Sequence, residues 1–285
     1  MYNSLVNLKF PILLSACFLL LAWSTYEPPR NINTESTPLH NAAASGDVAK
    51  VELLLSKGVS VDIRSNITKA TPLHFASWKG RYETAKRLIE KGADVNATTK
   101  WGATPIHYAS GLNSPVGLNP PCQPSSGLSE GHFQVARLLL GSGASAAHRD
   151  GHGNTALGEA ASANDVDIAR LLIDNGADLN AREVQYTPLD RAAVRGPDVA
   201  ILLVARGAEV NEPETITKET PLHAAAACGY IEVVRVLLQH GANTEAVDQF
   251  GNTPLDLTEQ AEKYTNNDNF SEILRLLRPE SNQTN

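Results

Sequence analysis

The sequence predicts an all-α solenoid of about seven helix-turn-helix units joined by hairpin fingers. Two observations lead to this prediction: a motif that begins Thr-Pro-Leu in most of its copies recurs along the chain, and a glycine follows most copies at a similar distance. Successive motif threonines are 34, 33, 51, 32, 33 and 33 residues apart. Self-similarity at such a period indicates stacked copies of one supersecondary unit. The units begin near Thr37, Thr71, Thr104, Thr155, Thr187, Thr220 and Thr253.

The first helix of each unit is expected to begin at the motif. Proline suits the first helical turn because its missing N–H costs nothing there, and the threonine hydroxyl before it can cap the helix. Small residues follow, such as Ala42 and Ala43 in the first unit. They should let neighbouring helices approach closely.

The second helix of each unit is expected to bury one apolar stripe, since its apolar residues recur at offsets of three and four. It should end at a glycine in the left-handed conformation, which glycine adopts without steric cost. In the fifth unit Pro197 should open this helix. The segment after each glycine, such as residues 150–154, has the composition of a turn. The terminating glycines are Gly58, Gly92, Gly143, Gly176, Gly207 and Gly241.

This period and these motifs resemble the ankyrin repeat, and the resemblance covers residues 37–278. It implies a fold of paired antiparallel helices with a finger between units. It also implies that the motif histidines cap their own helix and tether the neighbouring repeat by hydrogen bonds. Gly158, Asp190 and Asp256 stand where the family has histidine, so we expect those units to be tied less tightly. The motif histidines are His40, His74, His107 and His223.

The third unit contains an insertion at residues 111–130, where the motif threonine lies 27 residues before the glycine of the second helix instead of 9. Its prolines and glycines argue against regular secondary structure. We expect it to project from the turn between the two helices, opposite the fingers. It is either a tolerated surface loop or a loop or lid that contacts a partner.

Two of the three cysteines, Cys122 in the insertion and Cys228 in the sixth unit, should lie on the same edge of the stack. Three repeat steps of about 8–10 Å separate them by roughly 24–30 Å. A disulfide needs α-carbons about 4.4–6.8 Å apart. Only a nearly fully stretched loop could join them, so we expect two free thiols.

Residues 1–24 are predicted to be a signal peptide or membrane anchor. The apolar run from Phe10 to Trp23 is shorter than the roughly 20 residues of a spanning helix, and it reads as a signal-peptide core with a cut after Ser24. Leu14 to Cys17 also resembles a bacterial lipobox, and an uncleaved anchor is a third reading. All three make the protein exported, either periplasmic or secreted, and the lipidated and uncleaved forms would be tethered to a membrane. Residues 25–36 read as a linker and 279–285 as a tail.

Composition and motifs argue against several other functions. A net charge of -7 has the wrong sign for nucleic acid binding by bulk attraction. His148, Asp150 and His152 are too few ligands for a strong metal site. A glycine pattern at residues 141–146 follows a helix rather than a strand, which is the wrong context for a dinucleotide. We predict no enzyme, no catalytic residue, no cofactor and no metal. Four glycosylation sequons are about what chance gives, which favours a bacterial exported protein.

The resemblance implies another protein as partner, bound by the concave face and the fingers. A monomeric, non-catalytic scaffold is the expected function. An inhibitor or immunity protein that occludes an enzyme or toxin with the insertion is the alternative, and a host-directed effector or a metal-dependent accessory is less favoured. Aromatic and arginine side chains anchor interfaces most often. The candidate contacts are Phe75, Trp78, Lys79, Trp101, Tyr108, His152, Tyr186, Arg191 and Phe250.

Overall fold

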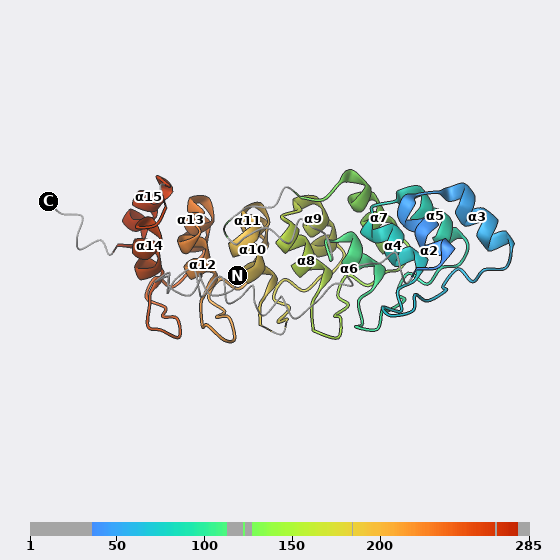
Figure 1. Ribbon diagram of the computed structural model, residues 1–285. Coiled ribbons are helices and arrows are strands. Elements are labelled where there is room, and N and C mark those ends of the chain that lie inside the picture. The colour runs from blue at the N-terminus through green and yellow to red at the C-terminus, as the bar shows by residue number, and fades with distance from the viewer. Residues whose placement is uncertain (1–35, 113–121, 123–126, 184, 266, 279–285) are drawn as a thin grey trace, which may run out of the picture.

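The computed structural model describes residues 36–112, 122, 127–183, 185–265 and 267–278. Helices follow one another in antiparallel pairs and form one elongated stack (Figure 1). The predicted all-α solenoid is therefore confirmed. In chain order the helices are α2 (Pro38–Ser45), α3 (Val48–Ser56), α4 (Pro72–Trp78), α5 (Tyr82–Glu90), α6 (Pro105–Ala109), α7 (Glu130–Gly141), α8 (Ala156–Ala163), α9 (Val166–Asp174), α10 (Pro188–Arg195), α11 (Pro197–Ala205), α12 (Pro221–Ala227), α13 (Ile231–Gln239), α14 (Pro254–Glu262) and α15 (Asn269–Leu277).

The stack has two helical layers. The even-numbered helices, α2 to α14, are the inner helices and contact one another in sequence; the odd-numbered helices, α3 to α15, are the outer helices and do the same. A finger links each outer helix to the next inner helix, and the fingers hang side by side below the helices in Figure 1. Within the described ranges the fingers are built from turns, with one isolated antiparallel bridge between Arg149 and Thr155.

The local signals act where the sequence places them. Each inner helix begins at the residue after its motif threonine, and six of the seven have proline there. Pro197 begins α11, as expected. The glycines after the outer helices adopt positive φ, for example 86° at Gly92 and 81° at Gly241. The start and the end of most helices are thus marked by residues within the same unit.

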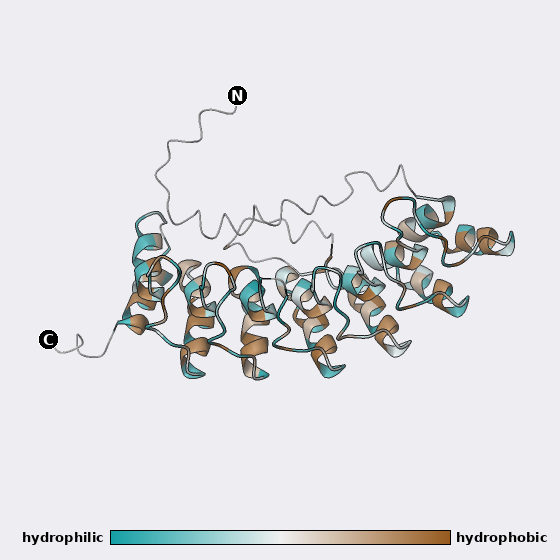
Figure 2. Cartoon of the chain, turned by 90° about the horizontal axis from the view of Figure 1, so that it is seen from below, coloured by the Kyte–Doolittle hydropathy of each residue, from teal (hydrophilic) through white to brown (hydrophobic). Residues whose placement is uncertain are grey.

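The core is one continuous cluster that runs through all the units. In units two to six the motif leucine or isoleucine of the inner helix and one leucine of the outer helix are fully buried, as Leu73 and Leu88 are in the second unit. Figure 2 shows the stack from below, with its hydrophobic stretches mainly on the helices. Because each repeat contacts only its neighbours, this apolar burial depends on stacking.

The insertion lies against the following units, and the prediction that it projects from the stack was wrong for its described residues. The amide of Gly127 donates to Ala163 O at 3.2 Å, and the amide of Leu128 donates to Asp165 Oδ2 at 2.9 Å. Both acceptors lie in the turn between α8 and α9. The amide of Cys122 donates to Val194 O near the end of α10 at 3.1 Å. These contacts follow the row of turns that join inner to outer helices.

The expectation of free thiols was also wrong, since Cys122 and Cys228 form a disulfide with their α-carbons 4.8 Å apart. Cys228 is the C-terminal cap residue of α12, in the sixth unit. The physical reason is the length of the loop: the eleven residue-to-residue steps from Gly111 to Cys122 can span about 36–40 Å when extended. That exceeds the roughly 24–30 Å of three repeat steps. The disulfide therefore joins the third unit to the sixth.

The predicted signal peptide or anchor at 1–24, most of the linker at 25–36 and the tail at 279–285 lie outside the described residues. Among the helices that are described, none is long and apolar enough to cross a membrane.

Candidate functional site

The motif histidines join each unit to the next finger. In the second unit Nδ1 of His74 accepts the amide of Thr71 at 3.0 Å, so its Nε2 carries the proton and donates to Ala103 O at 3.1 Å. Burial lowers the pKa of His74 to about 3, which keeps the ring neutral. His40, His107 and His223 make the same pair of contacts, with Nε2 on Ala70, Asn154 and Asn252 respectively.

The fourth unit has Gly158 at the histidine position and replaces the ring with a side chain from the following finger. Glu183 Oε1 accepts the amide of Thr155 at 2.8 Å and its hydroxyl at 2.9 Å. A Cβ at Gly158 would collide with this carboxylate. The expectation that this unit is tied less tightly was wrong, because Glu183 both caps helix α8 and connects the two units.

The units with aspartate at this position keep only the cap. Asp190 Oδ2 accepts the amide of Thr187 at 2.7 Å and its hydroxyl at 2.9 Å, and Asp256 does the same with Thr253. Histidine reaches the next finger with its Nε2 atom. The aspartate side chain is shorter and has no group in that position. Burial raises the pKa of Asp190 to about 7, although its bonds to Thr187 oppose the shift.

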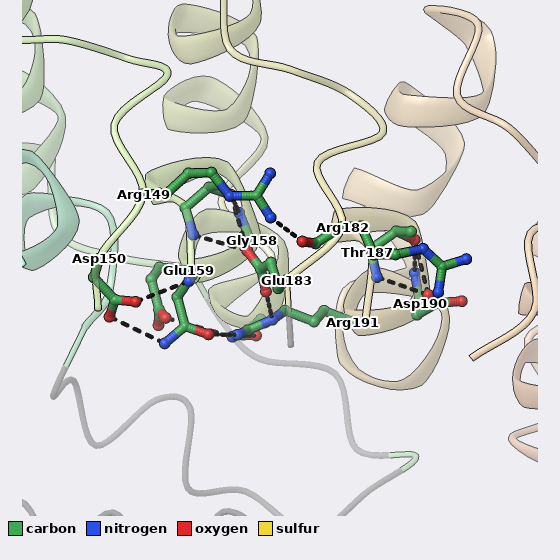
Figure 3. Close-up of polar contacts among 12 residues, drawn as sticks. Arg149, Asp150, Gly158, Glu159, Arg182, Glu183, Thr187, Asp190 and Arg191 are labelled. Carbon is green, nitrogen blue, oxygen red and sulfur yellow. Dashed lines mark hydrogen bonds and ion pairs between the residues drawn. The ribbon is translucent and has the colours of Figure 1, made fainter. Parts of the chain in front are cut away.

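A buried ionic cluster lies between the fourth and fifth units (Figure 3). The guanidinium of Arg191 pairs with Glu183 and with Glu159 and donates to Asn154 Oδ1 at 2.7 Å. Asn154 in turn donates to Asp150 Oδ2 at 3.1 Å. Burial raises the pKa of Glu159 to about 7, although Arg191 opposes the shift. Burial alone would lower the pKa of Arg191, but Glu183 and Glu159 raise it.

The cluster serves the fold rather than a ligand. Arg191 on helix α10 of the fifth unit pairs with Glu159 on helix α8 of the fourth and with Glu183 in the finger between them, so the cluster fixes how units four and five stack. Breaking a buried pair by removing one partner is strongly destabilising because the other charge is left uncompensated. Arg191 was predicted to contact a binding partner, but its side chain is buried and paired within the protein.

The other candidate contact residues divide into a buried and an accessible set. Phe75 and Tyr108 are buried, with their rings 4.8 and 5.4 Å from those of His40 and His74 respectively. Both therefore pack against the neighbouring unit. The half-buried or exposed candidates lie on the inner-helix ends and the fingers: Trp78, Lys79, Trp101, His152, Tyr186 and Phe250.

Within the accessible set, the Lys79 ammonium lies 3.7 Å from the centre of the Trp78 ring. Phe250 is 69% exposed at the tip of its finger. The sequence reasoning missed Ile67, Ile216 and Val247, which are also exposed on fingers. A signal for two of them was present, because the sequence Ile-Thr-Lys precedes two of the motifs at the same distance.

His148 and His152, on the finger that carries Asp150, make hydrogen bonds within the protein: His148 through its ring and His152 through its backbone amide. His148 Nε2 lies 3.0 Å from Gly102 O, and the amide of His152 donates to Asp150 Oδ1 at 2.8 Å. Across the part of the chain that the structure describes, no group of three or more histidine, cysteine or acidic side chains could hold a metal ion.

Comparison with models of known protein families identifies matches over most of the chain. Residues 13–99 and 127–214 match the model for ankyrin repeats in three copies, and residues 217–249 match the model for the ankyrin repeat. The chain belongs to the ankyrin repeat family. Its fold is that of a protein-protein interaction module, and this fold is generally a non-catalytic scaffold.

Three proteins illustrate the similarity. The ankyrin repeat domain of human ASB11 superposes with a TM-score of 0.66 at 27% identity, covering 86% of this chain and 99% of that domain. Cyclin-dependent kinase 4 inhibitor B of Rattus norvegicus is 34% identical over 113 residues, which are 39% of this chain and 85% of the inhibitor. A Danio rerio protein described as a palmitoyltransferase, ZDHHC13, is 27% identical over 161 residues, or 55% of this chain, and the match spans only 22% of that protein.

Proposed function

We propose that this protein is a monomeric, non-catalytic scaffold that binds another protein outside the cytoplasm, in the periplasm or after secretion. The observation that carries the location is the disulfide between Cys122 and Cys228. Disulfides persist in oxidising compartments and are rare in the cytosol. The apolar run from Phe10 to Trp23 supports the same location as a possible export signal. A bacterial source stays a prediction.

The binding surface consists of the accessible candidates on the inner-helix ends and fingers. Trp78 and Trp101 lie on adjacent units and are both half-buried, so each offers aromatic area at a fixed position. Large aromatic side chains anchor interfaces because they bury much area at a small cost in conformational entropy.

The test is cross-linked affinity capture of the tagged protein expressed with its own leader, followed by mass spectrometry. We expect one stoichiometric protein that is lost when Trp78 and Trp101 are both changed to alanine. Leu53→Ala is the matched control, because Leu53 is 53% exposed on the outer helix α3. Recovery of the protein in the cytosol with no partner would contradict the proposal. The mass of the recovered chain separates a cut after Ser24, a lipid on Cys17 and an uncut anchor.

An inhibitor or immunity protein is the second candidate. One relative, cyclin-dependent kinase 4 inhibitor B, is an inhibitor by name. Occlusion of an enzyme or toxin by the insertion predicts that deleting residues 111–130 abolishes partner binding, whereas Cys228→Ser, which breaks the same disulfide but keeps the insertion, leaves binding intact. Equal loss in both variants would assign the effect to the disulfide.

A further inference from the structure

The ionisable side chains at the finger tips are sorted by sign. The finger edge is defined here as residues 64–70, 98–103, 149–154, 182–183, 185–186, 214–219 and 247–252. Its lysines and arginines are all exposed, and its carboxylates are all buried. The cations are Arg64, Lys69, Lys100, Arg149, Arg182 and Lys218, and the carboxylates are Asp150, Glu183, Glu214, Glu219 and Asp248.

Most of these carboxylates are already committed to the fingers themselves. Asp248 Oδ1 accepts the amides of Phe250 and Asn252, both at 2.8 Å, and Asp150 makes the equivalent bonds in its own finger. Glu214 accepts the hydroxyl of Thr217 at 2.8 Å. A partner that touches the finger edge therefore meets cations, although the whole chain carries a net charge of -7.

Exposed apolar side chains lie among these cations. Ile67 and Ile216 are each 52% exposed, Val247 is 54% exposed and Phe250 is 69% exposed. Ile216, Val247 and Phe250 lie on two adjacent fingers, and large apolar side chains gathered on one surface mark interaction sites. The fingers lie along one side of the stack (Figure 1), so the finger edge offers both apolar and cationic side chains on that side.

Two fingers present the same pair of side chains. In Ile67-Thr68-Lys69 and Ile216-Thr217-Lys218 the lysine has positive φ, 58° and 60°, which is uncommon for a residue with a side chain. Each threonine turns inward, with Thr68 Oγ1 2.6 Å from Ser65 Oγ and Thr217 bonded to Glu214. The isoleucine and lysine remain exposed at both sites. The two tips are four units apart.

We infer that the finger edge binds an acidic protein segment that carries apolar side chains, an inference that rests on the proposed function and specifies its partner. Carboxylates of the segment would meet Lys69, Lys100 and Lys218, and its apolar side chains would contact Ile67 and Ile216. Four steps of about 8–10 Å separate the outer two sites by roughly 32–40 Å. An extended segment of about 10–12 residues spans that distance.

Nucleic acid and anionic lipid fit this surface less well than an acidic polypeptide. Exposed carboxylates such as Asp94, Asp178 and Glu209 lie in the segments that lead into the fingers. These carboxylates and the net charge of -7 oppose a uniformly charged polyanion most, because such a ligand places a phosphate opposite every part of the surface, whereas a peptide can carry its few carboxylates opposite the lysines alone. A polypeptide can satisfy both kinds of contact, since its sequence can alternate acidic and apolar residues.

The test is selection of a phage-displayed library of random peptides of about 16 residues, long enough to reach between the two tips, on the full-length protein. We expect the enriched peptides to be acidic and to carry Leu, Ile or Phe. Removing hot-spot contacts should weaken binding of a labelled enriched peptide by about tenfold or more. The variants are Lys69→Ala/Lys100→Ala/Lys218→Ala and Ile67→Ser/Ile216→Ser. Added salt should also weaken binding, because exposed charge pairs are screened.

The matched control is Lys57→Ala/Lys86→Ala/Lys91→Ala, which removes the same charge from exposed positions in or next to the outer helices. It should change the affinity by less than about twofold, since charges beyond a Debye length contribute little. Circular dichroism of each variant verifies the fold.

Several results would overturn the inference. Enrichment of basic peptides, no enrichment, or acidic peptides that bind the finger variants as tightly as the unchanged protein would each do so. The inference would also be overturned if single-stranded DNA or phosphatidylserine vesicles bound more tightly than the peptides and this binding was lost in the finger variants. A partner captured through Trp78 and Trp101 would still support the proposed function in any of these cases, whereas absence of both peptide and partner would remove both.

Discussion

Glu183 fills the space that the absent side chain of Gly158 leaves, and its carboxylate accepts the two hydrogen bonds from Thr155 that a histidine ring receives in other units. The cap of one unit is therefore supplied by the finger of the next. Arg191 holds the same carboxylate from helix α10. A departure from the repeat motif at one position is compensated by residues 25 and 33 positions later in the chain.

Replacing Glu183 with alanine should destabilise the protein by about 3–5 kcal/mol, because it leaves the buried Arg191 with less compensation. Urea unfolding measures the effect. Glu212→Ala is the control: Glu212 pairs with Arg182 near the surface, and such pairs contribute about 0–1 kcal/mol. Equal losses in the two variants would show that burial does not govern the contribution of the Glu183 pair.

Gly158→His should destabilise the unchanged protein, because its Cβ collides with Glu183. In a Glu183→Ala background the same substitution has room and restores the histidine cap on Thr155. We expect the double variant to be more stable than Glu183→Ala alone. A double-mutant cycle from urea unfolding gives the coupling free energy between positions 158 and 183. Additive effects of the two substitutions would contradict the idea that Glu183 replaces the histidine ring.

Acid should weaken the stack through its histidines. The pKa of His74 is about 3 in the folded protein and 6.5 as its ordinary value, so below pH 6.5 the unfolded chain binds a proton that the folded chain does not. Stability therefore falls with pH from about 6.5 towards 3, by up to about 1.4 kcal/mol per pH unit for this residue.

The His74→Asn variant tests this contribution, since asparagine does not titrate. It should be about 1–2 kcal/mol less stable at pH 7.5, because it loses the bond to Ala103. Its free energy of unfolding should fall less steeply than that of the unchanged protein between pH 6.5 and 5. Parallel curves would show that His74 does not carry the pH dependence.

Removing the disulfide should lower stability by about 2–5 kcal/mol, as expected for a loop of this length. The Cys122→Ser/Cys228→Ser variant and the reduced protein should agree. Peptide mapping under non-reducing conditions should yield the linked pair, with a Cys17→Ser variant excluding exchange with the third cysteine. Free thiols at both positions in protein from an oxidising compartment would contradict the bond.

Lys69→Gly should stabilise the protein relative to Lys69→Ala by about 1 kcal/mol, because φ is 58° there and only glycine adopts that region without cost. The same comparison at Lys100, which is not among the residues with positive φ, should favour alanine or give no difference. Thermal unfolding of the four variants measures both comparisons.

The fold could be predicted from the sequence because its signals are local. A proline after threonine marks the start of a helix and a glycine marks its end, and each signal acts within a few residues of its own position. The cap by Glu183 could not be predicted, because a carboxylate in one finger carries no local sign of a vacancy at Gly158. The path of the insertion was missed for the same reason: Cys122 bonds to a residue 106 positions away.

The burial of the candidate contacts could be predicted only in part, because the position of a residue in the repeat does not determine whether its side chain is buried. Phe75 and Tyr108 carry aromatic rings at variable positions, yet histidine rings of the preceding unit cover them. Phe250 lies at the tip of its finger and is exposed. Whether a side chain is accessible depends on its neighbours in the adjacent unit, which no single repeat specifies.

The Cys122–Cys228 bond changes how the protein would respond to mechanical force. In a chain pulled from its two ends, tension passes across the bond, so the residues between the two cysteines bear no load. With a separation of 106 residues, the fully stretched oxidised chain should be shorter than the reduced one by about 35–38 nm. Under force the oxidised molecule should therefore unfold only outside the segment between Cys122 and Cys228, which carries no tension.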